Sequence, residues 1–250
     1  MKKTAVVLFI FNVFCAYSLN IVFFPVNIDK SEESGVIQRY IDEAKNLCPM
    51  NLYAHRLSFF TIPVSEEPIK LDSYGRVNYK VRDLENIAEN SKPRPYVSIF
   101  IINSEKSIGI GGNIGENKLK VIIISKVSKK GTLSHELGHA LFELGDEYGG
   151  EFSIKFSDAY ASKYLNLSKN KPFELWEDIR EITGDEKIGY YPGGAGFSGD
   201  LYHSYPVCLM GDLKGVFCPV CLYLAVRKLN LITGENLDFT KIYKENLNCQ

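Results

Sequence analysis

Residues 132–148, TLSHELGHALFELGDEY, decide how this chain is interpreted. Their apolar side chains recur with helical spacing, and we predict a helix over residues 132–144. His135 and His139 are four residues apart, so they share one face of that helix and both imidazoles can reach a single ion. Glu136 is rotated by about 100° from His135, which places its carboxylate beside the ion rather than on it. The spacing therefore predicts a metal site on this helix.

A metal site of this composition suits hydrolysis of a protein or peptide. Zinc lowers the pKa of a water molecule and polarises a carbonyl group. Glu136 is the expected general base, and it would then protonate the leaving amine. We expect one catalytic zinc ion, held by His135 and His139.

A third zinc ligand is expected after the helix. Glu143 lies four residues beyond His139, but ligands on three successive turns span about 12 Å and cannot converge on one ion. Gly145 permits a left-handed turn that ends the helix and folds the chain back. Asp146 is then the expected third ligand. The alternatives that stay open are Glu147, His203 and a more distant residue.

The charge balance bears on the class of partner. The 250 residues contain 29 Lys and Arg against 30 Asp and Glu, a formal net charge of -1. No basic excess is available to neutralise phosphates, so nucleic-acid binding is disfavoured. A hydrophobic content of 45% and a charged content of 24% are typical of a globular chain.

The N-terminus has the parts of a secretory signal. Lys2 and Lys3 precede an apolar run over residues 5–17, and small residues surround position 18. We predict a signal peptide over residues 1–18 and one catalytic domain over residues 19–250, secreted or at the cell surface. The alternatives are a buried first strand or an uncleaved anchor, the one case in which a membrane would be a partner. Cleavage would change the net charge to 27 minus 30, or -3.

The remaining pattern is that of an α+β protein. Two Val- and Ile-rich runs, residues 96–103 and 119–125, are the clearest strands. Further strands are expected at residues 20–28, where Pro25 favours an edge or a bulge, and at 56–64. Helices are expected at residues 31–48, 81–90, 173–182 and 219–232, and a Gly- and Tyr-rich loop at 190–206.

The glycine-rich stretch IGIGGNIG, residues 108–115, is not a nucleotide loop. A dinucleotide fingerprint opens a helix, and here a strand follows instead. We expect a mobile turn or a bulged edge segment, and no bound nucleotide.

Five cysteines would remain after cleavage, at positions 48, 208, 218, 221 and 249. In an exported chain they predict two disulfides and one odd thiol, with Cys208 in a structural disulfide. A structural zinc site on Cys208, Cys218, Cys221 and Cys249 is the alternative in a reducing compartment. A thiol redox role for Cys218 and Cys221 is a weaker possibility.

Four blocks together resemble the IgA-peptidase-like family of zinc metallopeptidases, which is related in style to the metzincins. The blocks are HELGHALFELGDEYGG (135–150), GYYPGGAGFSGDLY (189–202), CLM (208–210) and FCPVC (217–221). The resemblance implies a zincin domain, with a twisted mixed sheet and the active-site helix in an upper lobe and a smaller helical and loop lobe below. It implies zinc on His135 and His139, completed by Asp146, with Glu136 as acid/base. It also implies a Met-turn at Met210, whose thioether packs beneath the ligands.

One departure from the metzincin pattern concerns the third ligand. Metzincins place a third histidine six residues after the second, where this chain has Gly145. A tyrosine could also donate a hydrogen bond to the tetrahedral intermediate. Tyr202 is the first candidate because it lies near Met210, followed by Tyr148, Tyr190 and Tyr191.

The sequence as a whole predicts a zinc-dependent endopeptidase. In zincins an edge strand pairs with the extended substrate, and residues 108–118 or 119–125 could supply it. The alternatives are a non-catalytic, zincin-like binding module at the cell surface and, less favoured, a thiol redox protein.

Overall fold

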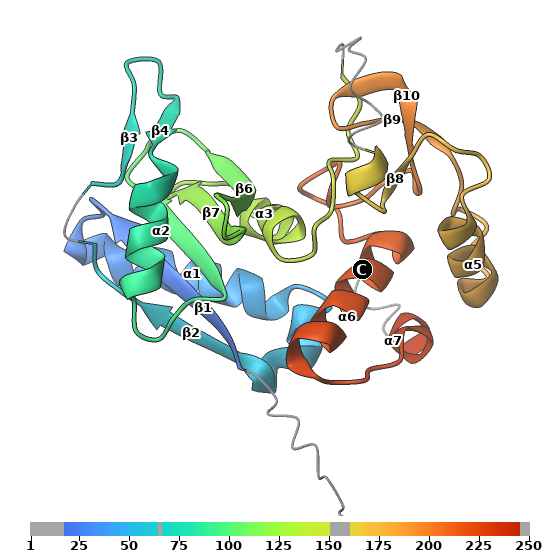
Figure 1. Ribbon diagram of the computed structural model, residues 1–250, viewed down its shortest axis with the longest axis horizontal. Coiled ribbons are helices and arrows are strands. Elements are labelled where there is room, and N and C mark those ends of the chain that lie inside the picture. The colour runs from blue at the N-terminus through green and yellow to red at the C-terminus, as the bar shows by residue number, and fades with distance from the viewer. Residues whose placement is uncertain (1–17, 65–66, 151–160, 246–250) are drawn as a thin grey trace, which may run out of the picture.

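A five-stranded mixed sheet lies at the centre of the part of the molecule built by residues 19–125 (Figure 1). The structure is a computed structural model that describes residues 18–64, 67–150 and 161–245. The first four strands in spatial order are parallel, and the last is an antiparallel edge strand. The order is β2 (Leu57–Thr61), β1 (Leu19–Val26), β5 (Val97–Ile102), β7 (Leu119–Ser125) and β6 (Gly109–Ile114).

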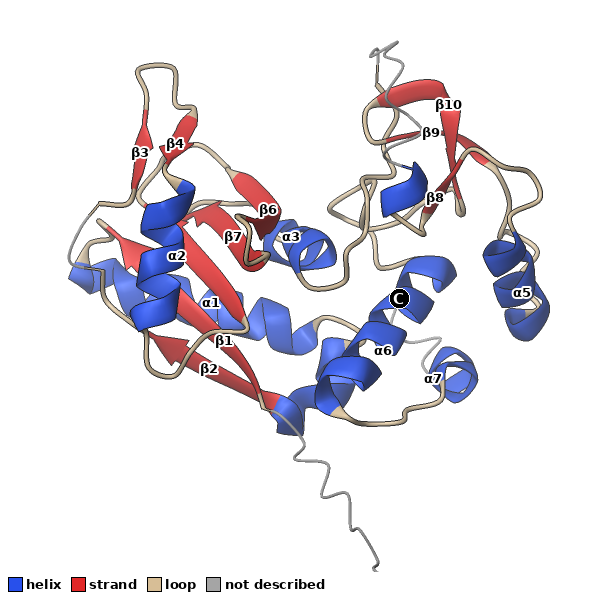
Figure 2. Cartoon of the chain, in the orientation of Figure 1, coloured by secondary structure: helices blue, strands red, loops and turns tan. Residues whose placement is uncertain are grey.

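Helices cover both faces of this sheet (Figure 2). Alternate residues of β1 serve the two faces, because successive side chains of a strand point to opposite sides. Ile21 and Phe23 join the core that includes α1 (Lys30–Asn46) and α3 (Thr132–Ala140). The other face packs against α2 (Val81–Asn90) and the hairpin of β3 (Ile69–Leu71) and β4 (Val77–Tyr79).

A second, three-stranded sheet lies across α3 from the first one (Figure 1). Its order is β8 (Leu167–Ser168), β10 (Phe197–His203) and β9 (Tyr191–Gly194). Trp176 of α5 (Glu174–Thr183) is buried and donates its indole N–H to the Leu165 carbonyl. Other helices among the described residues are η1 (Met50–Arg56), α6 (Pro219–Thr233) and α7 (Phe239–Glu245), and residues 161–163 are also helical.

The predicted α+β class and mixed sheet are confirmed, and one predicted loop is wrong. Residues 190–206 contain β9 and β10, which pair as an antiparallel hairpin. The turn residues Ala195 and Gly196 both have positive φ. The hairpin was missed because its glycines interrupt the alternation of apolar and polar residues that marks a strand.

The structure refines two other expectations, which concern the glycine-rich segment at the sheet edge and Pro25. Residues 109–114 form a regular strand whose register with β7 is continuous, so the expected bulge is absent there. Pro25 pairs with Ile101 of β5 but lies beyond the β1–β2 pairing, which ends at Phe23. At Pro25 the strand is therefore paired along one side only, as its missing N–H requires.

The helix predicted over residues 132–144 ends earlier, at Ala140. The left-handed residue that turns the chain is Glu143, with φ 58°, and not Gly145. Gly145 is needed for another reason. A Cβ atom there would lie 2.7 Å from a Leu167 methyl carbon and 2.9 Å from the Tyr164 ring.

The N-terminal predictions fall largely outside the described residues. The signal peptide of residues 1–18 is described only at Ser18, so it stays a prediction, as does the single domain over 19–250. Among the described helices, none is long and apolar enough to span a bilayer.

Candidate metal centre

Helix α3 is held at its start by a carboxylate from α1. The preceding residue, Gly131, has φ 90° and offers no side-chain cap. Glu43 supplies one, because its Oε1 accepts hydrogen bonds from the backbone N–H of Ser134 at 2.9 Å and from its hydroxyl at 3.1 Å. This cap satisfies an otherwise unpaired N–H of the first turn and fixes α3 relative to α1.

Three ligand atoms converge beyond the end of α3. The Nε2 atoms of His135 and His139 are 3.1 Å apart. Asp146 Oδ1 lies 3.2 Å from the first and 3.1 Å from the second. Tetrahedral ligands about 2.0–2.1 Å from a zinc ion are separated by about 3.3–3.4 Å. The three atoms therefore form one face of a zinc coordination sphere without rearrangement.

When the two rings are neutral, their hydrogen bonds leave no proton on the atoms that face one another. His135 Nδ1 donates to the Leu209 carbonyl at 2.9 Å, and His139 Nδ1 donates to the Leu144 carbonyl at 2.8 Å. In a neutral ring Nε2 then carries a lone pair. Asp146 Oδ1 is buried and has no hydrogen-bond partner. Three acceptors that face one another need a cation between them, so these residues fit a zinc ion.

Burial and mutual contact also shift the ionisation of this group. Burial lowers the pKa of His135, but its interactions with Asp146 and Leu209 outweigh burial and raise the pKa. Burial raises the pKa of Asp146, but the contacts with His135 and His139 dominate and lower it. The carboxylate of Asp146 is therefore ionised and available as a ligand.

Glu136 lies beside the trio under strand β6. Its side chain is buried, which raises its pKa, and it interacts electrostatically with His135, His139 and Asp146. A Cβ atom on Gly109 would lie 2.5 Å from Glu136 Oε1, and one on Gly111 would lie 2.6 Å from the Glu136 carbonyl oxygen. The glycine run thus lets an edge strand pass directly over this carboxylate, a role that its sequence alone did not indicate.

Met210 lies against α3 between the two histidines. It is fully buried, and a Cβ atom on Gly138 would be 2.4 Å from its Sδ. The segment around it also orients other groups. Leu209 supplies the carbonyl that holds His135, and the Met210 carbonyl accepts from the Glu147 N–H at 2.8 Å. The backbone carbonyls of this turn therefore orient His135 and the segment that carries Glu147.

The prediction of two disulfides with one odd thiol is wrong, and so is the expectation that Cys208 forms a disulfide. Cys208, Cys218 and Cys221 are free thiols rather than members of a disulfide. They gather with Glu147, and the ligand atoms of the four residues lie within 4.8 Å of one another. Glu147, the alternative third ligand, therefore faces the cysteines, and Asp146 is the acidic residue brought to the histidines.

The other candidates have contacts elsewhere. His203 Nδ1 donates to the Gly193 carbonyl, and its ring stacks on Tyr191. The hydroxyl of Tyr190 binds Glu177, and that of Tyr191 binds the Lys187 carbonyl. Tyr202 packs against the core, with the Lys171 ammonium 3.5 Å from its ring centroid. Tyr148 is 49% exposed.

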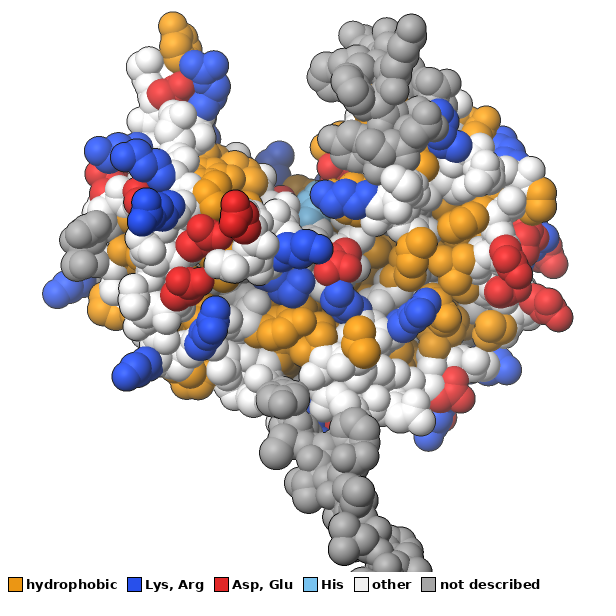
Figure 3. All heavy atoms as spheres, viewed as in Figure 1, with side chains coloured by type: hydrophobic (Ala, Val, Ile, Leu, Met, Phe, Trp, Pro, Cys, Tyr) orange, Lys and Arg blue, Asp and Glu red, His pale blue; other side chains and the backbone are white. Residues whose placement is uncertain are grey.

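The surface is hollowed between the parts of the molecule that carry the two sheets, and a histidine side chain is visible in that hollow (Figure 3).

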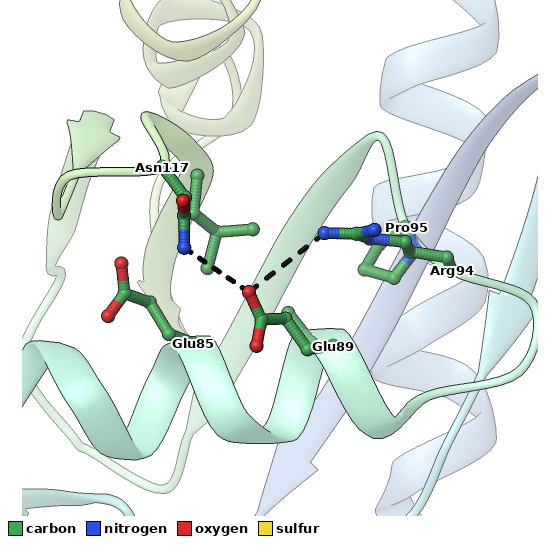
Figure 4. Close-up of a pocket in the computed structure, with 7 residues that line it drawn as sticks. Glu85, Glu89, Arg94, Pro95 and Asn117 are labelled. Carbon is green, nitrogen blue, oxygen red and sulfur yellow. Dashed lines mark hydrogen bonds and ion pairs between the residues drawn. The ribbon is translucent and has the colours of Figure 1, made fainter.

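A separate small cavity lies on the α2 side of the large sheet (Figure 4). There Glu89 accepts from Asn117 and pairs with Arg94. The cavity has a volume of about 40 Å³, which has room for a few water molecules.

Comparison with known proteins gives distant similarities only. No family model and no curated protein matches the chain. An archaemetzincin from Methanopyrus kandleri is similar at 12% identity and a TM-score of 0.41, covering 87% of this chain and 98% of its own. A chain in a chaperone–substrate complex is 10% identical with a TM-score of 0.41, over 89% of this chain but 36% of that one. A lysine decarboxylase from Francisella novicida reaches 12% identity and a TM-score of 0.23, over 71% of this chain and 22% of its own.

Proposed function

We propose that this protein is a zinc-dependent endopeptidase of the IgA-peptidase-like, metzincin-related type. The observation that supports this proposal is the convergence of His135 Nε2, His139 Nε2 and Asp146 Oδ1 next to the buried carboxylate of Glu136. Three protein ligands leave one coordination position open, as in catalytic rather than structural zinc sites. A zinc ion bound there supplies acidification of a water molecule and polarisation of the scissile carbonyl.

Glu136 moves the proton in this proposal. Its carboxylate accepts a proton from the attacking water, whose oxygen bonds to the carbonyl carbon. When the C–N bond breaks, Glu136 returns that proton to the leaving amine. Burial raises the pKa of Glu136, which favours a group that must hold a proton between the two steps. Leu209 and Leu144 keep both imidazoles in the ligating tautomer throughout.

Strand β6 is the proposed platform for the substrate backbone. It is the edge strand of the large sheet, and among the described strands it pairs with β7 only. Its glycines run over Glu136, so an extended peptide paired along the free edge of β6 would present its carbonyls near the catalytic group. This supports residues 108–118, which contain β6, over residues 119–125 as the substrate-pairing segment.

Two further parts of the proposal rest on the sequence. Tyr202 remains the first candidate for a donor to the tetrahedral intermediate, although its described contacts are with Lys171 and the core. Secretion or a cell-surface location rests on the apolar run over residues 5–17 behind Lys2 and Lys3.

The test is Glu136→Gln in zinc-loaded protein, assayed on unfolded casein and a peptide library. We expect turnover to fall by about 10²–10⁴-fold, because general acid–base catalysis is lost, while zinc remains bound. Glu143→Gln is the matched control. Glu143 lies near the same helix end but is about half exposed and pairs with Lys228 at 2.8 Å.

Undiminished turnover by Glu136→Gln would remove Glu136 from the mechanism. A wild-type protein that binds zinc at the histidines and cleaves nothing would instead support the binding-module alternative. The thiol redox alternative is disfavoured because Cys218 is only 3% exposed and Cys221 is fully buried, whereas a redox thiol needs access to its partner.

A further inference from the structure

A second group of side chains that can bind a metal lies in the interior, and it has four members. They come from three segments: Glu147 after α3, Cys208 beside Met210, and Cys218 and Cys221 at the start of α6. All four are buried, with exposures between 0% and 4%. Such a meeting of soft and charged donors in a protein interior is unusual, because each would otherwise need a partner of its own.

The distances fit a tetrahedral ion. Cys221 Sγ is 3.0 Å and Cys218 Sγ is 3.9 Å from the same oxygen, Glu147 Oε1. Zinc binds sulfur at about 2.3 Å and carboxylate oxygen at about 2.0–2.2 Å, so tetrahedral ligands of this mix lie about 3.5–3.8 Å apart. The two distances to Glu147 Oε1 lie on either side of that separation, and all four ligand atoms lie within 4.8 Å of one another, so a small adjustment brings them around one ion.

Only one of the two carboxylate oxygens of Glu147 has hydrogen-bond partners. Its Oε1 accepts from the Asn166 amide at 3.0 Å and from the Cys221 thiol at 3.0 Å. Its Oε2 is buried and has no hydrogen-bond partner. A buried carboxylate oxygen without a partner is strongly unfavourable, and a cation between it and the thiols removes that penalty.

The backbone around the sulfur atoms is arranged for thiolates. The Cys218 N–H donates to Cys208 Sγ at 3.3 Å, and the Cys221 N–H donates to Cys218 Sγ at 3.5 Å. Cys218 is also the N-cap of α6, so the positive end of the helix dipole faces the cluster. These groups stabilise the negative charge that thiolate ligands carry around a metal.

We propose that Glu147, Cys208, Cys218 and Cys221 bind a second zinc ion, which is structural. Three sulfur ligands select a soft or borderline ion, and four protein ligands close the coordination sphere. This ion would join the segment after α3, the Met210 turn and α6 at one point. The four-cysteine set that the sequence suggested shares Cys208, Cys218 and Cys221 with this site, and its fourth member, Cys249, lies outside the described residues. The proposal does not depend on the peptidase activity.

The experiment begins by counting metal in protein purified without chelator. Wild-type protein should hold two zinc ions per chain, and His135→Ala/His139→Ala should hold one. X-ray absorption of that double variant should show about three sulfur neighbours at about 2.3 Å from zinc. After replacement of the zinc by cobalt, it should show thiolate-to-cobalt charge-transfer absorption. These readouts use an intact cysteine cluster, so they do not depend on whether cysteine variants fold.

Cys221→Ser supplies the complementary measurement, and Val220→Ala is its packing control. Val220 lies in the same turn and is fully buried, but it offers no ligand. Cys221→Ser should lose one zinc and the charge-transfer absorption, and Val220→Ala should keep both. Three results would overturn the proposal. The double histidine variant could bind no zinc, or its zinc could lack sulfur neighbours. The native protein could also contain a disulfide among Cys208, Cys218 and Cys221.

Discussion

The two ligand clusters differ in access although they share one stretch of backbone. The side chains of His135, His139 and Asp146 keep exposures of 11%, 15% and 24%, and the carboxylate of Glu136 lies beside them. The cluster of Glu147 and three cysteines is closed on all sides. Catalytic zinc sites keep an open position and structural ones do not, so the difference in burial separates the two proposed roles.

Consecutive residues serve the two clusters because the segment between them is held on both sides. The Asp146 carbonyl accepts from the Ala195 N–H at 2.8 Å, at the tip of the β9–β10 hairpin. The Glu147 N–H donates to the Met210 carbonyl at 2.8 Å. With the backbone fixed by these bonds, Asp146 reaches the histidines and Glu147 reaches the cysteines.

The largest expected effect separates these two neighbours. Asp146→Asn should weaken zinc at the histidines by at least about 100-fold, since even loss of a group that only orients a ligand costs 10–100-fold. Glu147→Gln should weaken zinc at the cysteines to a similar extent. Competition with a chelator measures both affinities, and the thiolate-to-cobalt absorption identifies which cluster lost its ion.

Activity and stability should divide in the same way. Asp146→Asn should lose peptide hydrolysis even far below its melting temperature, whereas Glu147→Gln should lower the melting temperature and keep hydrolysis below it. If Glu147→Gln emptied the histidine site while Asp146→Asn left it filled, the two carboxylates would exchange roles and the comparison above would be wrong.

A second prediction concerns the strand over Glu136. A Cβ atom at Gly111 would meet the backbone oxygen of Glu136 at 2.6 Å, whereas one at Gly112 meets nothing within 4 Å. Gly111→Ala should therefore destabilise the protein by about 1–3 kcal/mol through overpacking. It should also reduce turnover, because β6 or Glu136 must shift.

Gly112→Ala is the matched control for stability. Its change should be neutral or stabilising by up to about 1 kcal/mol, because alanine reduces the freedom of the unfolded chain. Denaturant unfolding measures both variants. Equal stability of the two would show that β6 does not pack on Glu136 as closely as the structure has it.

The sequence predicted local structure well where one pattern carried the information. The Val- and Ile-rich runs that became β5 and β7, and the helical spacing of α2, needed no tertiary context. His135, Glu136 and His139 were equally readable, because one helix turn fixes their relation. The sequence also predicted that Asp146 approaches the two histidines, because a third ligand has to come from the chain after the helix ends.

The grouping of Glu147 with three cysteines was not readable, because it depends on contacts between distant segments. Cys208 and Cys221 are separated from Glu147 by more than sixty residues, and no local pattern relates them. The glycines of β6 misled for a similar reason. They suggest a turn or bulge by themselves, and only the close approach of Glu136 explains them.

The smallest effect is expected at the joint between α1 and α3. Glu43→Ala removes the carboxylate that caps Ser134 and should destabilise the protein by about 1 kcal/mol, the usual loss for a helix N-cap. Asp42→Ala is the control, because its carboxylate binds Gln38 within α1 and lies on the exposed side. Zinc at the histidines should weaken slightly in Glu43→Ala and stay unchanged in Asp42→Ala, because α3 carries the ligands. The cysteine site, whose ligands lie outside α3, should keep its zinc in both variants, so a loss there would show that the two centres are not independently supported.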